Sequence, residues 1–254
     1  MLAPEQIEAF VRDGFVRVPA AFDARTAATC RDELWREIGY DAEDPATWVE
    51  PVVRVWHMHT EPFRAAVNTP ALHAAFDALV GAGRWVPRGG VGSLPLRFPH
   101  ADAAEDTGWH VDTSFADDEG RSRANLRSRE RALLMLFLFT DVGEDDAPTR
   151  IRVGSHRDTA RALASAGETG LEFMELAGAV ADVTADHPEA YATGAAGDVY
   201  LCHPFLVHAA QDIRGTRPRF MAQPPLVPVG DFDPDAENPV PVERAIAEAL
   251  RERR

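Results

Sequence analysis

Short runs with β-strand character, separated by Gly, Pro and acidic clusters, constrain the fold of this 254-residue chain more than any other feature. They fill the part of the chain between residues 91 and 227. Many short strands with turn signals between them are typical of an all-β sandwich or barrel. The expected strands cover residues 91–98, 108–115, 132–140, 150–153, 199–202, 206–209 and 219–227.

Helix signals dominate the part of the chain before these strands. Asp23 is a good N-cap and Gly39 a good C-terminal stop for one of the helices. Two later stretches, residues 99–107 and 116–130, read as long loops over the mouth of the barrel. We expect helices over residues 4–10, 23–38 and 70–81, and a strand over residues 15–18.

These patterns predict one domain over residues 1–254, mainly β with flanking helices. A helix-rich part would cover residues 1–85, the β core residues 86–230, and a C-terminal tail or helix residues 231–254. The patterns contain neither an internal repeat nor a low-complexity linker.

The charge balance excludes several function classes. The formal net charge of −15 argues against nucleic acid as a partner, because phosphate binding needs a basic face. All 26 basic residues are Arg, which excludes a Schiff-base lysine and a Walker-type phosphate loop. Cys30 and Cys202 are far apart in the sequence and read as ordinary buried thiols.

The sequence shows no apolar run long enough to span a bilayer, and its first ten residues lack the features of a signal peptide. We therefore expect a cytoplasmic protein that acts on a small molecule, without a membrane partner. The oligomeric state stays open.

Two His-x-Asp pairs are candidates for metal binding. His110 and Asp112 fall on an expected strand, where side chains two residues apart share a face and can converge on one ion. His156 and Asp158 fall where a strand yields to a helix, and Asp158 is better explained as an N-cap. We therefore favour the first pair.

A third ligand must come from another segment, and residues 200–210 contain two histidines. His203 precedes a proline at an apparent turn, whereas His208 closes an apolar run suited to a strand, so we favour His208. Two His and one carboxylate leave coordination positions open and are typical of non-heme iron(II). Arg219 lies eleven positions further on and could hold a carboxylate by a bidentate pair, with Arg217 as its rival.

Over nearly its whole length the chain resembles the phytanoyl-CoA dioxygenase family. Residues 5–16 resemble the family's opening, residues 108–112 its iron-binding strand, residues 147–157 its strand and turn ending in Ser-His, and residues 197–219 its distal-ligand block. The resemblance implies a double-stranded β-helix, that is, a cupin-like jelly roll, with helices backing one sheet. It implies iron(II) held by His110, Asp112 and His208.

The resemblance also implies 2-oxoglutarate and O₂ as reactants, with Arg219 on the distal carboxylate of 2-oxoglutarate. Related halogenases replace the iron-binding carboxylate by a small residue, so Asp112 favours hydroxylation, desaturation or rearrangement of a small molecule, as in secondary metabolism. The phytanoyl-CoA enzymes proper use a Lys and a Trp as further 2-oxoglutarate contacts. This chain has no Lys, and the matching place on the strand of residues 132–140 is apolar. Arg97 and Thr149 are our substitutes for these contacts, and the departure argues against a CoA thioester substrate.

Three alternatives remain: a cupin-type iron oxygenase without 2-oxoglutarate, a catalytically inactive metal-binding barrel, and a zinc hydrolase. His57 and His59 form a His-x-His pair ahead of the β region and read as structural. The Arg-rich residues 121–129 read either as a solvated lid or as a lid that recognises an anionic group.

Overall fold

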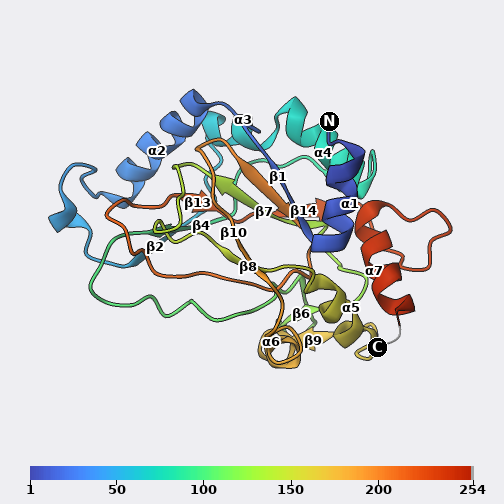
Figure 1. The fold of residues 1–254 in the computed structure, drawn as a ribbon. Coiled ribbons are helices and arrows are strands. Elements are labelled where there is room, and N and C mark those ends of the chain that lie inside the picture. Colours follow the sequence, from blue (N-terminus) through green and yellow to red (C-terminus); the bar gives the residue numbers. More distant parts are fainter. Residues whose placement is uncertain (253–254) are drawn as a thin grey trace.

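Strand β7 (Leu133–Leu138) lies at the centre of the largest sheet in the computed structural model, which describes residues 1–252 (Figure 1). All six residues of β7 are buried, which explains its continuous apolar sequence. The strand order is β1-β11-β7-β14-β3, with β13 also paired to β7, and the pairings in this sheet are antiparallel. Its other strands are β1 (Phe15–Val18), β3 (Trp85–Val86), β11 (Val199–Cys202), β13 (Met221–Ala222) and β14 (Pro225–Pro228).

Alternate residues of β7 belong to two different hydrophobic cores. Leu133, Met135 and Phe137 pack in a large core shared with the helices, whereas Leu134 and Leu136 pack in a smaller one. The smaller core also contains Ile151 of β8, and Ala190 of β10 packs against it, so the sheet β10-β8-β12 packs against the other face of the large sheet. Its strands are β8 (Arg150–Arg152), β10 (Glu189–Tyr191) and β12 (His208–Ala209).

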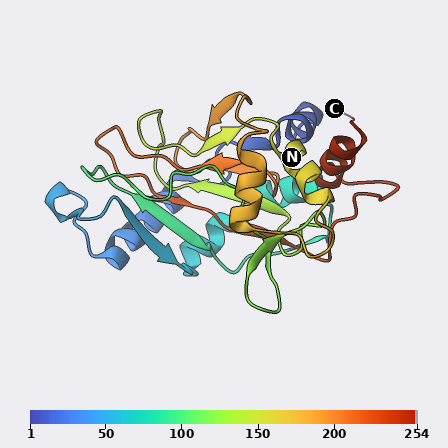
Figure 2. The same ribbon diagram turned by 90° about the horizontal axis from the view of Figure 1, so that it is seen from below.

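Two further small sheets lie near the site described below. One pairs β2 (Val52–Trp56) with β4 (Ser93–Arg97). The other has the order β5-β6-β9, formed by β5 (Phe115–Ala116), β6 (Ser122–Ala124) and β9 (Leu171–Glu172). This second sheet carries helix α6 (Phe173–Ala181), which in Figure 2 lies across the strands.

The remaining helices cover one side and one end of the large sheet. Figure 1 shows α2, α3 and α4 along one side, while α1, α5 and α7 gather at the end where both termini lie. Asp23 caps α2 by accepting a hydrogen bond from the Thr26 N–H, and Gly39 ends it with φ 71°. The bounds are α1 (Pro4–Asp13), α2 (Ala24–Ile38), η1 (Pro45–Thr47), α3 (Glu61–Val67), α4 (Pro70–Val80), α5 (His156–Ala164) and α7 (Pro241–Arg251).

The expectation of a sheet-rich fold with flanking helices is confirmed, and the strands over residues 15–18 and 199–202 have the expected bounds. Two local predictions were wrong. Residues 108–115 are mostly extended loop, because only His110 bridges to another segment and β5 begins at Phe115. Helix α5 begins at His156, so Asp158 lies in its first turn rather than at its N-cap.

None of the helices within residues 1–252 is long and apolar enough to cross a membrane. The cytoplasmic location stays a prediction.

Candidate metal centre

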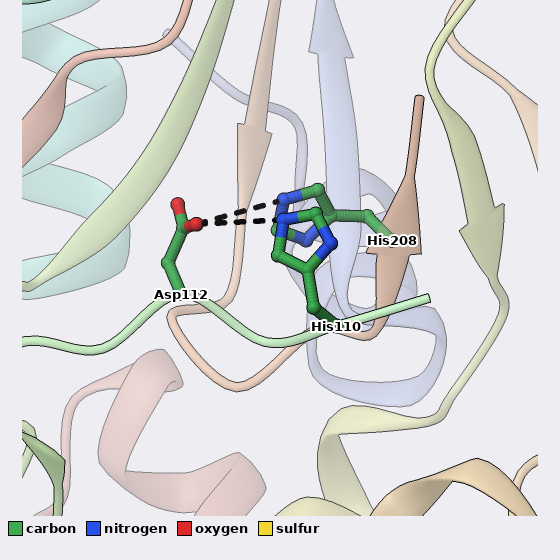
Figure 3. A group of neighbouring side chains, drawn as sticks. All are labelled: His110, Asp112 and His208. Atoms are coloured by element: carbon green, nitrogen blue, oxygen red, sulfur yellow. Dashed lines mark ion pairs between the residues drawn. The ribbon is translucent and has the colours of Figure 1, made fainter. Parts of the chain in front are cut away.

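His110, Asp112 and His208 form one cluster, with a ligand atom from each lying within 4.8 Å of the others (Figure 3). Asp112 Oδ1 lies 3.7 Å from His110 Nε2 and 3.9 Å from His208 Nε2. The figure shows the carboxylate facing both imidazoles, with His110 and Asp112 on one segment and His208 on β12. The side chains that the sequence singled out from two distant segments therefore meet.

The backbone brings the two histidines together. The His110 N–H donates to His208 O at 3.0 Å, and the His208 N–H donates to His110 O at 2.9 Å. Such a reciprocal pair is the hydrogen-bonded unit of an antiparallel ladder. It places the two Cα atoms opposite each other, and the imidazole centroids are 4.5 Å apart.

The histidine rings are held with their Nε2 atoms free to bind a metal. His110 Nδ1 lies 2.8 Å from Gly108 O, and His208 Nδ1 lies 3.0 Å from Leu206 O. A carbonyl oxygen only accepts, so each Nδ1 donates and each neutral ring keeps the lone pair on Nε2. Burial, followed by the charge of His110, lowers the pKa of His208 to about 4, which keeps this ring neutral near pH 7.

Asp112 is ionised and held from its far side. Burial raises the pKa of Asp112, but the positive charge of Arg131, and then that of the histidines, more than offsets it, so the pKa lies below its ordinary value. Arg131 Nη1 donates to Asp112 Oδ2 at 3.2 Å, while Oδ1 faces the histidines. The donor set is thus two imidazoles and one carboxylate, which fits a mononuclear iron(II) site.

The rival histidines lie elsewhere. His156 and His203 are fully buried, with ring centroids 4.9 Å apart. Their Nε2 atoms lie 3.1 Å from the carbonyls of Val11 and Val242, respectively. The structure therefore gives both rings a role in packing between the N-terminal helix, α5 and α7, and does not bring them to the cluster.

A cavity of about 820 Å³ opens beside the cluster, and Arg97 and Arg219 line it. These arginines form a second reciprocal backbone pair, with N···O distances of 3.0 and 2.9 Å. Both side chains are 1% exposed. Within the described residues, Arg219 Nε, Arg97 Nε and Arg97 Nη1 have no hydrogen-bond partner. Buried N–H donors without partners are rare, and here they mark a place for an anion.

The charges around these arginines support the same conclusion. Asp106 accepts from both Arg54 and Arg97, so these two guanidinium groups share one carboxylate, and Arg219 has no ion pair within the described residues. Burial, followed by the charge of Arg97, lowers the pKa of Arg219 well below its ordinary value. A bound carboxylate would supply the missing partner for the free N–H groups of Arg97 and Arg219, which fits the distal carboxylate of a dicarboxylate such as 2-oxoglutarate.

Of the remaining residues predicted to contact 2-oxoglutarate, some line the cavity and others do not. Arg217 is largely exposed, pairs with Asp146 and does not line the cavity. Thr149 is buried, its hydroxyl lies 3.7 Å from Met221 Sδ, and it does not line the cavity either. Arg97 and Arg219 are thus brought together, and Thr149 is not.

Several residues at the site were not predicted. Arg131 holds Asp112 across 19 positions, and no local pattern signals this contact. His57, read from the sequence as structural, lines the cavity with φ 62°, an uncommon conformation for a residue other than Gly. The other lining residues without a sequence signal include Trp56, Asp106, Trp109, Phe173 and Met174.

The Arg-rich loop of residues 121–129 is held by ion pairs and does not line the cavity. Its four arginines pair with Asp117, Glu168, Glu172 and Asp231. This loop supports the sheet that carries α6.

The family model described as phytanoyl-CoA dioxygenase matches residues 10–221. Comparison with curated proteins gave no match. Among solved structures, the carbocyclase SnoK from nogalamycin biosynthesis is similar at 18% identity and a TM-score of 0.61, over 91% of this chain and 86% of that one.

HygX from Streptomyces hygroscopicus, solved with nickel and 2-oxoglutarate, is similar at 19% identity and a TM-score of 0.60, over 92% and 90% of the two chains. EctD from S. alaskensis, solved with 2-oxoglutarate and 5-hydroxyectoine, is similar at 20% identity and a TM-score of 0.57, over 89% and 75%. At these identities the likeness to solved structures concerns the fold.

Proposed function

Since the chain belongs to the phytanoyl-CoA dioxygenase family and is an iron(II)- and 2-oxoglutarate-dependent oxygenase, we propose that His110, Asp112 and His208 hold its iron. The observation that carries this assignment is the convergence of two imidazoles and one carboxylate beside a cavity. When bound, the iron and 2-oxoglutarate activate O₂ for oxidation of the substrate and release succinate and CO₂.

The protein's own residues position the reactants. Arg219 and Arg97 would bind the distal carboxylate of 2-oxoglutarate through their unpartnered N–H groups. Arg131 fixes Asp112 Oδ2, so that Oδ1 is the oxygen presented to the metal. Thr149 has no part in this proposal.

We propose that the reaction is hydroxylation, desaturation or rearrangement of a small molecule in secondary metabolism. The retained carboxylate of Asp112 occupies the place that a halide would need. The missing Lys argues against a CoA thioester. Support comes from similar structures: one was solved with hygromycin B bound, and another is described as part of nogalamycin biosynthesis.

We also propose that residues 86–230 form a double-stranded β-helix, a jelly roll, within a single domain of residues 1–254. The packing of one antiparallel sheet on another around the smaller core supports this. The cupin-like architecture of such a core would place metal ligands between the two sheets.

The test is an anaerobic titration with iron(II) and 2-oxoglutarate, followed in the visible range. The wild-type protein should give a weak charge-transfer band, and His208→Ala should abolish it. His59→Ala is the matched control, because His59 is exposed and does not line the cavity. Under air, succinate release across a panel of small-molecule classes then identifies substrates. Absence of both the band and succinate from the wild type would support an inactive barrel.

A further inference from the structure

The cavity beside the metal cluster carries exposed apolar side chains on two walls, which different elements of the fold supply. One wall is the β2–β4 sheet and the other is the start of α6. Within residues 1–252, Trp56 is the only exposed Trp and Phe173 the only exposed Phe, at 56% and 38%. Both line this cavity, together with Met174, which is 75% exposed. Apolar side chains of this size are exposed together mainly where they bind something.

Strand β2 presents Trp56 as a fixed platform. Trp56 pairs with Ser93 in the sheet, and the His57 N–H donates to Gly92 O at 3.3 Å. Arg54 lies two residues earlier on the same face and also lines the cavity, whereas Val55 between them is buried on the other face. The Trp56 ring therefore faces the cavity because of the strand register.

The opposite wall is equally well anchored. Arg123 donates to Gly170 O at 3.1 Å and to Glu172 Oε1 at 3.0 Å, which fixes the residues just before α6. The Glu172 N–H donates a hydrogen bond to Glu175 Oε2 at 3.0 Å. The Phe173 ring lies 5.5 Å from the ring of His110, so a molecule against Phe173 is next to the metal cluster.

Each arginine that lines the cavity has a carboxylate partner or an assigned ligand. Arg131 pairs with Asp112, and Arg54 pairs with Asp106. This step rests on the proposed function, in which the free N–H groups of Arg97 and Arg219 bind 2-oxoglutarate. Glu105 is exposed at the cavity and has no ion pair among residues 1–252, so water can solvate it. An anionic substrate group would have to compete with Asp106, Asp112 or 2-oxoglutarate for these arginines, and an exposed carboxylate such as Glu105 adds little to the binding of a cation.

We propose that the outer cavity binds an uncharged substrate with a flat, hydrocarbon-rich face, which lies on Trp56 and is covered by Phe173 and Met174. Trp56 supplies a rigid platform, and the thioether side chain of Met174 adapts to the shape of the ligand. The whole cavity, including the part assigned to iron and 2-oxoglutarate, has a volume of about 820 Å³, within the range of small-molecule sites.

Three naphthalene derivatives with the same ring system and a neutral, anionic or cationic one-carbon substituent test this inference: 2-naphthylmethanol, 2-naphthoate and 2-naphthylmethylamine. Each is titrated by fluorescence into the anaerobic protein loaded with iron(II) and 2-oxoglutarate. We expect the neutral alcohol to bind most tightly. Trp56→Ser and Met174→Ser should each weaken its binding by about threefold to tenfold. Val49→Ser is the control, since Val49 is 64% exposed and lies outside the cavity.

Tighter binding of the anion or the cation, or equal binding to the wild type and both cavity variants, would overturn the inference. The charge-transfer band reports on the proposed function separately, and it should persist in Trp56→Ser and Met174→Ser. A band without binding of the alcohol refutes the apolar subsite alone. Binding of the alcohol without a band refutes the iron and 2-oxoglutarate assignment and leaves the apolar subsite standing.

Discussion

Arg219 is held by backbone carbonyls rather than by a carboxylate. Its Nη1 and Nη2 atoms donate to Ala147 O at 2.7 Å and to Pro95 O at 3.1 Å. Carbonyl oxygens orient the guanidinium but do not neutralise its charge. The charge is therefore left for a ligand, which distinguishes Arg219 from Arg217, whose charge is neutralised by Asp146.

We predict that Arg219→Gln raises the KM for 2-oxoglutarate by about tenfold to a hundredfold, because it removes a buried charge-assisted hydrogen bond. Arg217→Gln, the matched control, should leave this KM unchanged. Succinate release at varied 2-oxoglutarate concentration measures both. Equal KM values for wild type and Arg219→Gln would instead favour an oxygenase that does not use 2-oxoglutarate.

Arg131 supports a different prediction. Replacing a group that orients a metal ligand typically weakens metal binding by about tenfold to a hundredfold, and we expect this range for iron(II) with Arg131→Met. Arg129→Met should bind iron(II) as the wild type does, because Arg129 pairs with Glu168 and Asp231 away from the cavity. Competition with a coloured chelator measures the affinity for iron(II). An unchanged affinity in Arg131→Met would show that Arg131 does not orient Asp112 for metal binding.

At the residue scale the sequence indicated those groups whose chemistry and spacing are local. His110 and Asp112 are two positions apart, so the pattern itself suggests convergence. Arg131 and Asp106 act across loops, and their contacts depend on how distant segments pack. Thr149 was expected at the site for the same reason: the orientation of its side chain depends on the path of the backbone beside β8, which the sequence does not show.

At the scale of secondary-structure elements, the segment that precedes β9 and α6 can be tested, because it contains two glycines that form a matched pair. Gly167 and Gly170 both have positive φ, 62° and 66°. A Cβ at Gly167 meets nothing within 4 Å, whereas a Cβ at Gly170 would lie 2.0 Å from Ala124 O. The tight approach at Gly170 is where the chain joins β9 to β6.

We predict that Gly167→Ala lowers the free energy of unfolding by about 1 kcal/mol, through backbone strain alone. Gly170→Ala should cost about 3 kcal/mol or more, because the backbone must also move away from the Ala124 carbonyl. Urea denaturation measures both. Similar losses in the two variants would mean that the junction between β6 and β9 adapts without strain.

Elements with strong end signals were predicted well, whereas the bounds of the two-residue strands were not. Asp23 and Gly39 bounded α2 correctly, because capping is decided by neighbours in sequence. Strands β12 and β13 contain two residues each, too few for a periodic pattern. Helix α6 was missed, because an apolar run of nine residues with a Gly inside does not separate helix from strand.

At the scale of the whole molecule, buried histidines couple stability to pH. His156 is fully buried between α1 and the His203 ring, and its pKa is lowered to about 4, first by burial. An unfolded chain binds this proton near pH 6.5, whereas the folded protein does not. The stability contributed by neutral His156 is therefore complete above pH 6.5 and is lost as the pH falls towards 4.

We predict that this group lowers the free energy of unfolding by about 3 kcal/mol between pH 6.5 and 4. In His156→Gln the free energy of unfolding should decrease less over this pH range, by up to the amount that protonation of one group contributes. His59→Gln should show the same decrease as the wild type. Urea denaturation at several pH values gives the slopes. Identical slopes in His156→Gln and the wild type would contradict the assignment.

The two reciprocal backbone pairs, His110 with His208 and Arg97 with Arg219, have a consequence for how such a protein can evolve. Each pair is aligned by its own hydrogen bonds, which set the spacing of the two side chains within that pair. Apart from Asp106, which binds Arg97, the residues that connect the pairs can therefore change without altering this spacing. New substrates can thus be acquired by mutation of the connecting chain, with the chemistry inherited unchanged.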